Sequence, residues 1–154
     1  MTAIAFIALG SNLGNRTKNC EDAIAFLKKI PGIHVKKNSK WYETKALTLD
    51  EKPQPDYLNG AVQIETELSP MELLKVCKSI EKELGRIPSE KKWEPRVIDL
   101  DILLYDDLVF DTPELKIPHP EMHKREFVMK PLSEIAPKWK TWHKVPGSEE
   151  PGTL

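Results

Sequence analysis

Apolar and polar residues follow two rhythms along this chain, and each rhythm predicts a kind of element. Runs of apolar residues, or apolar residues at every second position, predict strands, whereas apolar residues three and four positions apart predict helices. Strands are expected at 4–9, 33–43, 57–66 and 97–105, with helices at 16–30 and 70–84, a short strand at 108–110 and a last helix at 127–135.

The two main helices carry signals at their ends. Asn15 is a predicted N-cap, and Ser69 followed by Pro70 combines a capping side chain with proline at the first helical position. Pro31-Gly32 and Gly85 are predicted to end these helices. The predicted boundaries therefore rest on local chemistry as well as on periodicity.

The order of the core elements, β-α-β-β-α-β, is that of a ferredoxin-like fold. We therefore predict an α+β protein, in which an antiparallel sheet has the two main helices on one face and the whole forms an α/β/α arrangement. The chain has 154 residues, the usual size of one domain, so a single domain over 1–154 is expected. This fold hosts many functions and does not by itself indicate a chemistry.

Composition limits the partners of the chain. The net charge is −1, so no overall field favours nucleic acid or an anionic membrane, and no apolar run reaches the length of a membrane span. Cys20 and Cys77 lie on the apolar stripes of predicted helices, which fits small buried residues in a reducing cytosol. We expect a cytoplasmic monomer that binds neither nucleic acid nor membranes.

The sharpest candidate for chemistry is the pair Asp99 and Asp101 in the fourth predicted strand. Side chains alternate across a strand, so both carboxylates lie on one face with Cα atoms about 6–7 Å apart. Such a pair can hold two magnesium ions for phosphoryl transfer. Spacing alone favours the solvated face of an edge strand, because acidic alternation is common there. Against this, Leu103-Leu104 indicates a buried central strand.

Other candidates lie on both sides of that strand. The segment 86–96 before it carries four cations and Trp93, which suits charge neutralisation on phosphates, although a solvated hairpin explains the lysines as well. After it, His119 and Arg125 are candidates to bind phosphate oxygens. His119 and His123 alone do not predict a zinc site, since no cysteine or third histidine accompanies them.

Two further segments bear on ligand binding. Tyr57 can stack on a flat heterocycle and Asn59 can read its hydrogen-bonding edge, but residue type alone favours a core aromatic at the start of a strand. The glycine-bearing turn 10–18 follows a strand but lacks the Lys-Ser/Thr pair of a P-loop. Any ATP must therefore be bound in another way.

Taken in order, several stretches resemble the 6-hydroxymethyl-7,8-dihydropterin pyrophosphokinase family. They run from Ala8-Leu-Gly-Ser-Asn-Leu-Gly14 to Pro131-Leu-Ser-Glu-Ile-Ala-Pro137 and so cover nearly the whole chain. The most specific is Gly85-Arg86 together with Trp93-Glu-Pro-Arg96-Val-Ile-Asp-Leu-Asp-Ile-Leu-Leu-Tyr105. The resemblance implies transfer of diphosphate from ATP to the hydroxymethyl oxygen of the pterin, with AMP leaving, as a step of folate biosynthesis.

The resemblance also implies a role for each matched residue. Catalytic roles fall to Arg86, Arg96, Asp99 and Asp101, the two aspartates holding two Mg²⁺ ions, and 86–96 is a mobile catalytic loop. Pterin-binding roles fall to Thr44, Leu47, Tyr57, Asn59 and Phe127. ATP-binding roles fall to Glu81, Trp93, Ile102, His119 and Arg125. The family pattern differs at Pro88, Glu94 and Pro120, where it more often has arginine, glycine and an aromatic residue.

Two alternatives of other classes use the same fold. One is a ferredoxin-like nucleic-acid-binding module, which needs a basic face and paired aromatics on its central strands, where this chain has aspartates. The other is a small-molecule-binding regulatory domain without ATP turnover. Release of AMP that depends on the pterin and on magnesium would distinguish the enzyme from both.

Overall fold

The computed structural model describes residues 2–44, 56–85, 97–120, 122 and 125–136, and within them the predicted β-α-β-β-α-β order is present. The elements in chain order are β1 (Ala3–Ser11), α1 (Arg16–Lys29), β2 (Ile33–Asn38), β3 (Tyr42–Thr44), β4 (Tyr57–Thr66), α2 (Pro70–Glu83), β5 (Asp99–Tyr105), β6 (Phe110–Asp111), β7 (Lys116–Ile117) and α3 (Glu126–Ile135).

The strands of the main sheet follow the order β2-β4-β1-β5, and every neighbouring pair is antiparallel. The short strand β3 also pairs with β4, beyond the end of β2. β6 and β7 form a separate two-stranded sheet. β1 therefore lies between β4 and β5, as its continuous apolar run predicts.

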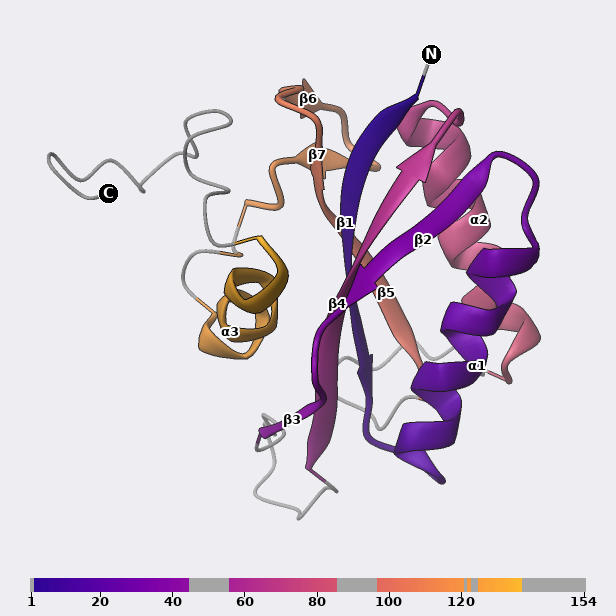
Figure 1. Cartoon of the computed structure of the whole chain (residues 1–154), viewed down its shortest axis with the longest axis vertical. Coiled ribbons are helices and arrows are strands. Elements are labelled where there is room, and N and C mark those ends of the chain that lie inside the picture. Colours follow the sequence, from indigo (N-terminus) through magenta and orange to yellow (C-terminus); the bar gives the residue numbers. More distant parts are fainter. Residues whose placement is uncertain (1, 45–55, 86–96, 121, 123–124, 137–154) are drawn as a thin grey trace, which may run out of the picture.

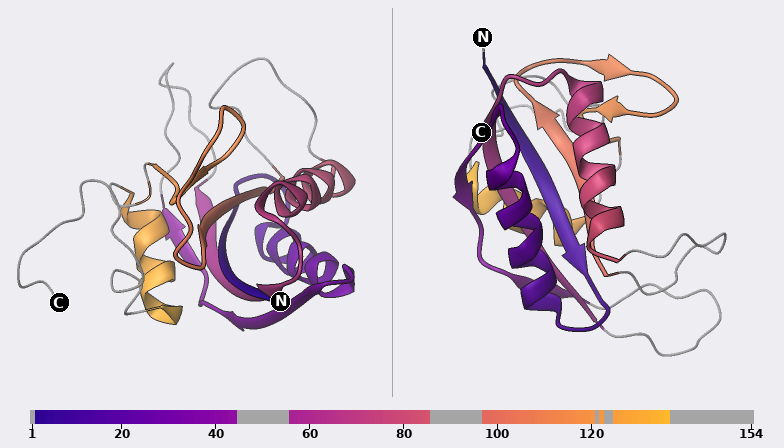
Figure 2. Two further views of the ribbon diagram at one scale, coloured as in Figure 1. Left: turned by 90° about the horizontal axis from the view of Figure 1, so that it is seen from above. Right: turned by 90° about the vertical axis from the view of Figure 1, so that its right-hand side faces the viewer.

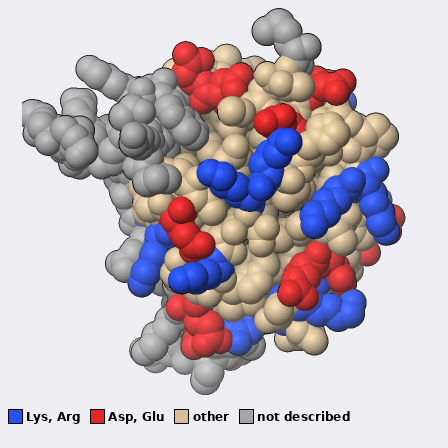
Figure 3. Space-filling model, viewed as in Figure 1, with Lys and Arg blue, Asp and Glu red and all other residues tan. Residues whose placement is uncertain are grey.

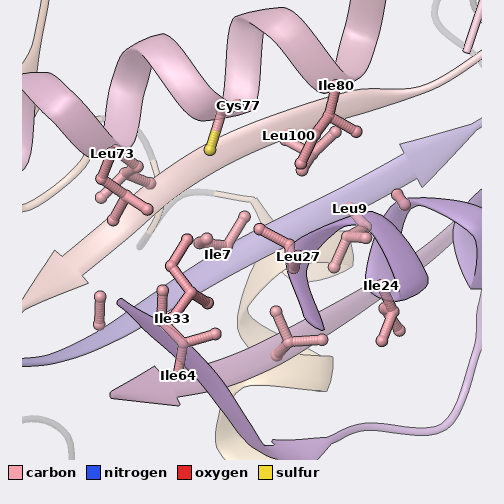
Figure 4. Close-up of a cluster of buried hydrophobic side chains, with 14 of the residues drawn as sticks. Ile7, Leu9, Ile24, Leu27, Ile33, Ile64, Leu73, Cys77, Ile80 and Leu100 are labelled. Atoms are coloured by element: carbon pink, nitrogen blue, oxygen red, sulfur yellow. The ribbon is translucent and has the colours of Figure 1, made fainter. Parts of the chain in front are cut away.

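The helices cover both faces of this sheet, so the fold has three layers. α1 and α2 lie on one face and α3 on the other (Figures 1 and 2). The larger apolar cluster fills the space under α1 and α2, where Leu27, Leu73 and Cys77 meet Ile7 and Leu100 of the sheet (Figure 4). The predicted α+β fold with α/β/α layering is confirmed.

The helix ends follow the predicted chemistry. The side chain of Asn15 accepts the Lys18 N–H at 3.1 Å, and Ser69 and Glu72 form a reciprocal capping box at the start of α2. At the other end of α2, Gly85 has φ +96°, a left-handed conformation that favours glycine. Local capping thus fixes the ends of the helices that carry the core.

Three strand predictions need correction. The strand expected at 33–43 is divided at 39–41, where the Ser39 hydroxyl accepts the Ala61 N–H that a ladder carbonyl would otherwise take. The short strand expected at 108–110 is β6, which begins at its last residue. β5 is not central but the last strand of the sheet. Leu103 and Leu104 are nevertheless buried because they pack in the cluster under α3.

Candidate active site

The predicted site residues of β4 and β5 meet on one face of the sheet, on either side of β1. Gly10 pairs with Asn59 on one side and with Asp99 on the other, and Ala8 pairs in the same way with Ala61 and Asp101. Directly paired residues point their side chains to the same face. Ala8 and Ala61 pack in the cluster that contains α3, so this is the α3 face.

Between the site residues of β4 and those of β5, the α3 face of β1 carries only the small residues Ala8 and Gly10. A Cβ atom added at Gly10 would lie 3.1 Å from Asn59 Oδ1 and 3.5 Å from Cδ1 of the Tyr57 ring. The ring and the amide therefore lie close to the bare backbone of Gly10. β4 and β5 are two strand spacings apart, about 10 Å, with β1 between them.

The two aspartates lie on one face of β5, as their spacing predicts. Asp99 is half-buried and Asp101 is exposed. Among the described residues, no group of three or more His, Cys, Asp or Glu side chains is placed to hold a metal ion. Two carboxylates nevertheless suit Mg²⁺, which takes one or two protein carboxylates and completes its octahedron with water and substrate phosphates.

An open cavity of about 250 Å³ adjoins Asp101 at the outer edge of β5. It is lined by Leu74, Lys78, Leu100, Asp101, Ile102, Pro113, Glu114, Leu115, Lys116, His119 and Pro120. The backbone N–H of Leu100 points outward from the sheet to Glu81. Because N–H directions alternate along a strand, the N–H of Ile102 faces the same outer edge, where a planar ligand could accept it.

Glu81 lies behind this cavity rather than among its lining residues. Its side chain is buried, its Oε2 accepts the Leu100 N–H at 2.9 Å, and its Oε1 is 3.6 Å from Lys78 Nζ. The carboxylate thereby holds β5 to α2. Lys78 and Lys116 bring two cations to the cavity that the sequence did not single out, because nothing in their spacing reveals that they lie beside Asp101.

The start of α3 brings two predicted residues together. The guanidinium carbon of Arg125 lies 5.8 Å from the centre of the Phe127 ring, and Phe127 is half-buried against the α3 cluster. Thr44 is the register partner of Tyr57 at the end of β3. The predicted site residues Leu47, Arg86, Trp93 and Arg96 lie outside the described residues, as do Pro88, Glu94 and His123. Pro120 is exposed at the rim of the cavity.

The two cysteines take no part in this site. Both are buried among apolar side chains of α1 and α2, as predicted. Burial raises the pKa of Cys20 and of Cys77 to about 12, so both remain thiols at neutral pH. Neither is a nucleophile in the folded chain.

The surface carries no single-sign field on the face shown in Figure 3, where acidic and basic side chains are interspersed. Within the described part of the chain, no helix is long and apolar enough to cross a bilayer. On that face, the described charges therefore form no large patch of one sign.

The fold and the carboxylate pair suit an α+β enzyme of phosphoryl-group transfer. The family model for 7,8-dihydro-6-hydroxymethylpterin-pyrophosphokinase matches residues 6–137. The chain belongs to this family and is a pyrophosphokinase.

Individual relatives agree with the family model. A 2-amino-4-hydroxy-6-hydroxymethyldihydropteridine pyrophosphokinase of Synechocystis is 46% identical over 135 residues, 88% of this chain and 67% of that protein. Its counterpart in Bacillus subtilis is 45% identical over 88% of this chain and 79% of its own length. A folic acid synthesis protein of Schizosaccharomyces pombe is 46% identical over 87% of this chain, which spans only 18% of that protein.

A solved structure shows the same fold at low identity. The crystal structure of an HPPK-DHPS protein in complex with substrates matches with a TM-score of 0.67 and 14% identity. The match covers 89% of this chain and 40% of that one. At this identity the likeness concerns the fold alone.

Proposed function

We propose that this pyrophosphokinase transfers the terminal diphosphate of ATP to 6-hydroxymethyl-7,8-dihydropterin in folate biosynthesis. The hydroxymethyl oxygen attacks the β-phosphorus in line, the bond from that phosphorus to the α,β-bridging oxygen breaks, and AMP leaves with that oxygen. The hydroxyl proton passes to solvent. The family match and the names of the relatives support this reaction.

One observation carries the assignment of the site. Asn59 and Asp99 are both register partners of Gly10, so a residue suited to reading a pterin edge lies across one strand from a carboxylate suited to magnesium, which supports the proposal. With Tyr57 and Phe127 as the aromatic walls, the hydroxymethyl group would point over β1 toward Asp99 and Asp101. Reacting groups held in this way need little further positioning.

The nucleotide is proposed to bind along the outer edge of β5. Ile102 would offer its backbone to the base, and His119 and Arg125 would contact phosphate oxygens, beside Lys78 and Lys116. Asp99 and Asp101 would hold two Mg²⁺ ions, which when bound neutralise charge on the phosphates. Glu81 would act through β5, and Arg86, Trp93 and Arg96 would act on the phosphates. One chain, acting as a cytoplasmic monomer, would hold both substrates.

The aspartates provide the test. Asp99→Asn and Asp101→Asn keep shape but remove charge, so each should lower kcat more than tenfold, at least about 1.4 kcal/mol of transition-state stabilisation, with unchanged circular dichroism. Asp107→Asn, an exposed carboxylate just beyond β5, is the matched control and should keep full kcat. A variant at Asp99 or Asp101 that keeps a tenth or more of wild-type kcat would remove the metal assignment.

A further inference from the structure

Glu134 on α3 accepts hydrogen bonds from the start of β3 and from the residue two positions before it, on the other side of the proposed pterin site. Its Oε1 accepts the Tyr42 hydroxyl at 2.6 Å, and both carboxylate oxygens lie 3.1 Å from the backbone N–H of Lys40. Tyr42 and Lys40 are 92 and 94 positions away along the chain. One side chain thus joins two elements that have no nearby covalent connection.

The two elements carry the two walls of the site. α3 holds Phe127, which lies seven residues before Glu134 and so on the same side of the helix. β3 pairs with the start of β4, where Tyr42 is opposite Asn59 and Thr44 is opposite Tyr57. The separation between the walls therefore depends on how α3 lies against β3 as well as on the apolar packing of α3 on the sheet.

We infer that Glu134 is a positioning residue for the diphosphate transfer, because it holds the helix of Phe127 at a fixed place against the strand pair of Tyr57 and Asn59. This inference rests on the proposed function. Glu134 touches neither substrate in this account. It acts through Tyr42 and the backbone at Lys40, and the ligand that depends on it is the pterin.

The hydrogen bond between Tyr42 and Glu134 is short and charge-assisted, and a second contact from α3 supports it. The hydrogen bond to Glu134 raises the pKa of Tyr42 above its ordinary value of 10.0, and the hydroxyl is protonated at neutral pH and donates. Lys130, one turn before Glu134, places its ammonium 5.6 Å from the centre of the Tyr42 ring. A charge-assisted bond of this kind is shorter and stronger than a neutral one.

β3 is also held by contacts that do not involve α3. Arg16 at the start of α1 pairs with Glu43 and donates to the Asp56 carbonyl at 2.7 Å. Removal of Glu134 should therefore leave β3 and β4 in place and shift α3 only where it lies against β3, because its apolar residues, such as Val128 and Leu132, still pack on the sheet. Exposed ion pairs and hydrogen bonds contribute little to global stability, so the effect should appear in the site before it appears in folding.

Glu134→Ala and Glu134→Gln test this role, with Ser133→Ala as the control on the same exposed side of α3. Glu134→Ala should raise the KM for pterin at least tenfold, leave the KM for ATP within about twofold, and shift Tm by no more than a few degrees. Glu134→Gln should lie between, since one acceptor oxygen remains. Combining Tyr42→Phe with Glu134→Ala should add little to the single change, because both remove the same link.

Calorimetric titration of pterin into each protein gives a readout independent of turnover. Wild type that binds pterin, with Glu134→Ala at least tenfold weaker, supports the role. Equal pterin affinity of the two, or equal losses for pterin and ATP, overturns the inference and leaves the proposed function intact. Wild type that neither binds pterin nor releases AMP overturns both.

Discussion

At the scale of single residues, the proposed site depends on the lack of a side chain at Gly10 as well as on the polar and aromatic side chains around it. Gly10 separates Asn59 from Asp99 in a direct row across three strands. Its bare backbone allows the Tyr57 ring and the Asn59 amide to lie close above β1. Gly10 is not in a left-handed conformation, so its importance is one of space rather than of backbone freedom.

Gly10→Ala should therefore weaken pterin binding several-fold while ATP binding changes little. The added methyl would lie 3.1 Å from Asn59 Oδ1, tighter than an ordinary contact, and Asn59 is buried and cannot move away freely. Calorimetry with each ligand measures the effect. Ala8→Gly, on the same face of β1, removes a methyl group instead of adding one and is the control. Unchanged pterin affinity in Gly10→Ala would contradict the proposal that the pterin binds over the backbone of Gly10.

The sequence reveals which residues share a face but not which residues meet. The spacing of Asp99 and Asp101 placed both carboxylates on one side of a strand, as found. Lys78, Lys116 and Glu134 gave no such signal, because each is a charged residue on an otherwise ordinary helix or short strand. Their place beside the site follows from the packing of α2, β7 and α3 around the sheet.

At the scale of elements, local chemistry fixed the helices better than the strands. The capping side chains predicted for α1 and α2 are in place. The strand predictions failed where side chains or coverage change the ladder: the Ser39 hydroxyl divides β2 from β3, and the residues packed around Leu103 bury an edge strand. An apolar run reports burial, and burial can come from a helix as well as from a neighbouring strand.

The capping box of α2 predicts a pH dependence of stability. The Ser69 backbone N–H lowers the pKa of Glu72 below its ordinary value of 4.5. A lowered carboxylate pKa stabilises the fold above pH 4.5, and this contribution is lost as pH falls through the folded-state pKa. Glu72→Gln keeps an acceptor but does not titrate, so urea unfolding from about pH 7 to about pH 3 should show wild type losing more stability than the variant. Parallel curves would contradict this reading.

At the scale of the whole molecule, the larger apolar core and the candidate site lie on different sides of the sheet. The face under α1 and α2 holds the larger core (Figures 1 and 4). The α3 face and the β5 edge hold the candidate site residues. The fold alone admitted a nucleic-acid-binding module and a regulatory domain. The family match over residues 6–137 favours the enzyme over both.

The central claim is the transfer of an intact diphosphate, and ³¹P NMR of the reaction mixture tests it most directly. With ATP, magnesium and 6-hydroxymethyl-7,8-dihydropterin, the account predicts equal amounts of AMP and of a pterin diphosphate, whose two phosphorus signals couple to each other. Omission of the pterin should leave ATP intact. Formation of ADP with a pterin monophosphate, or release of free diphosphate at the same rate without the pterin, would contradict the account.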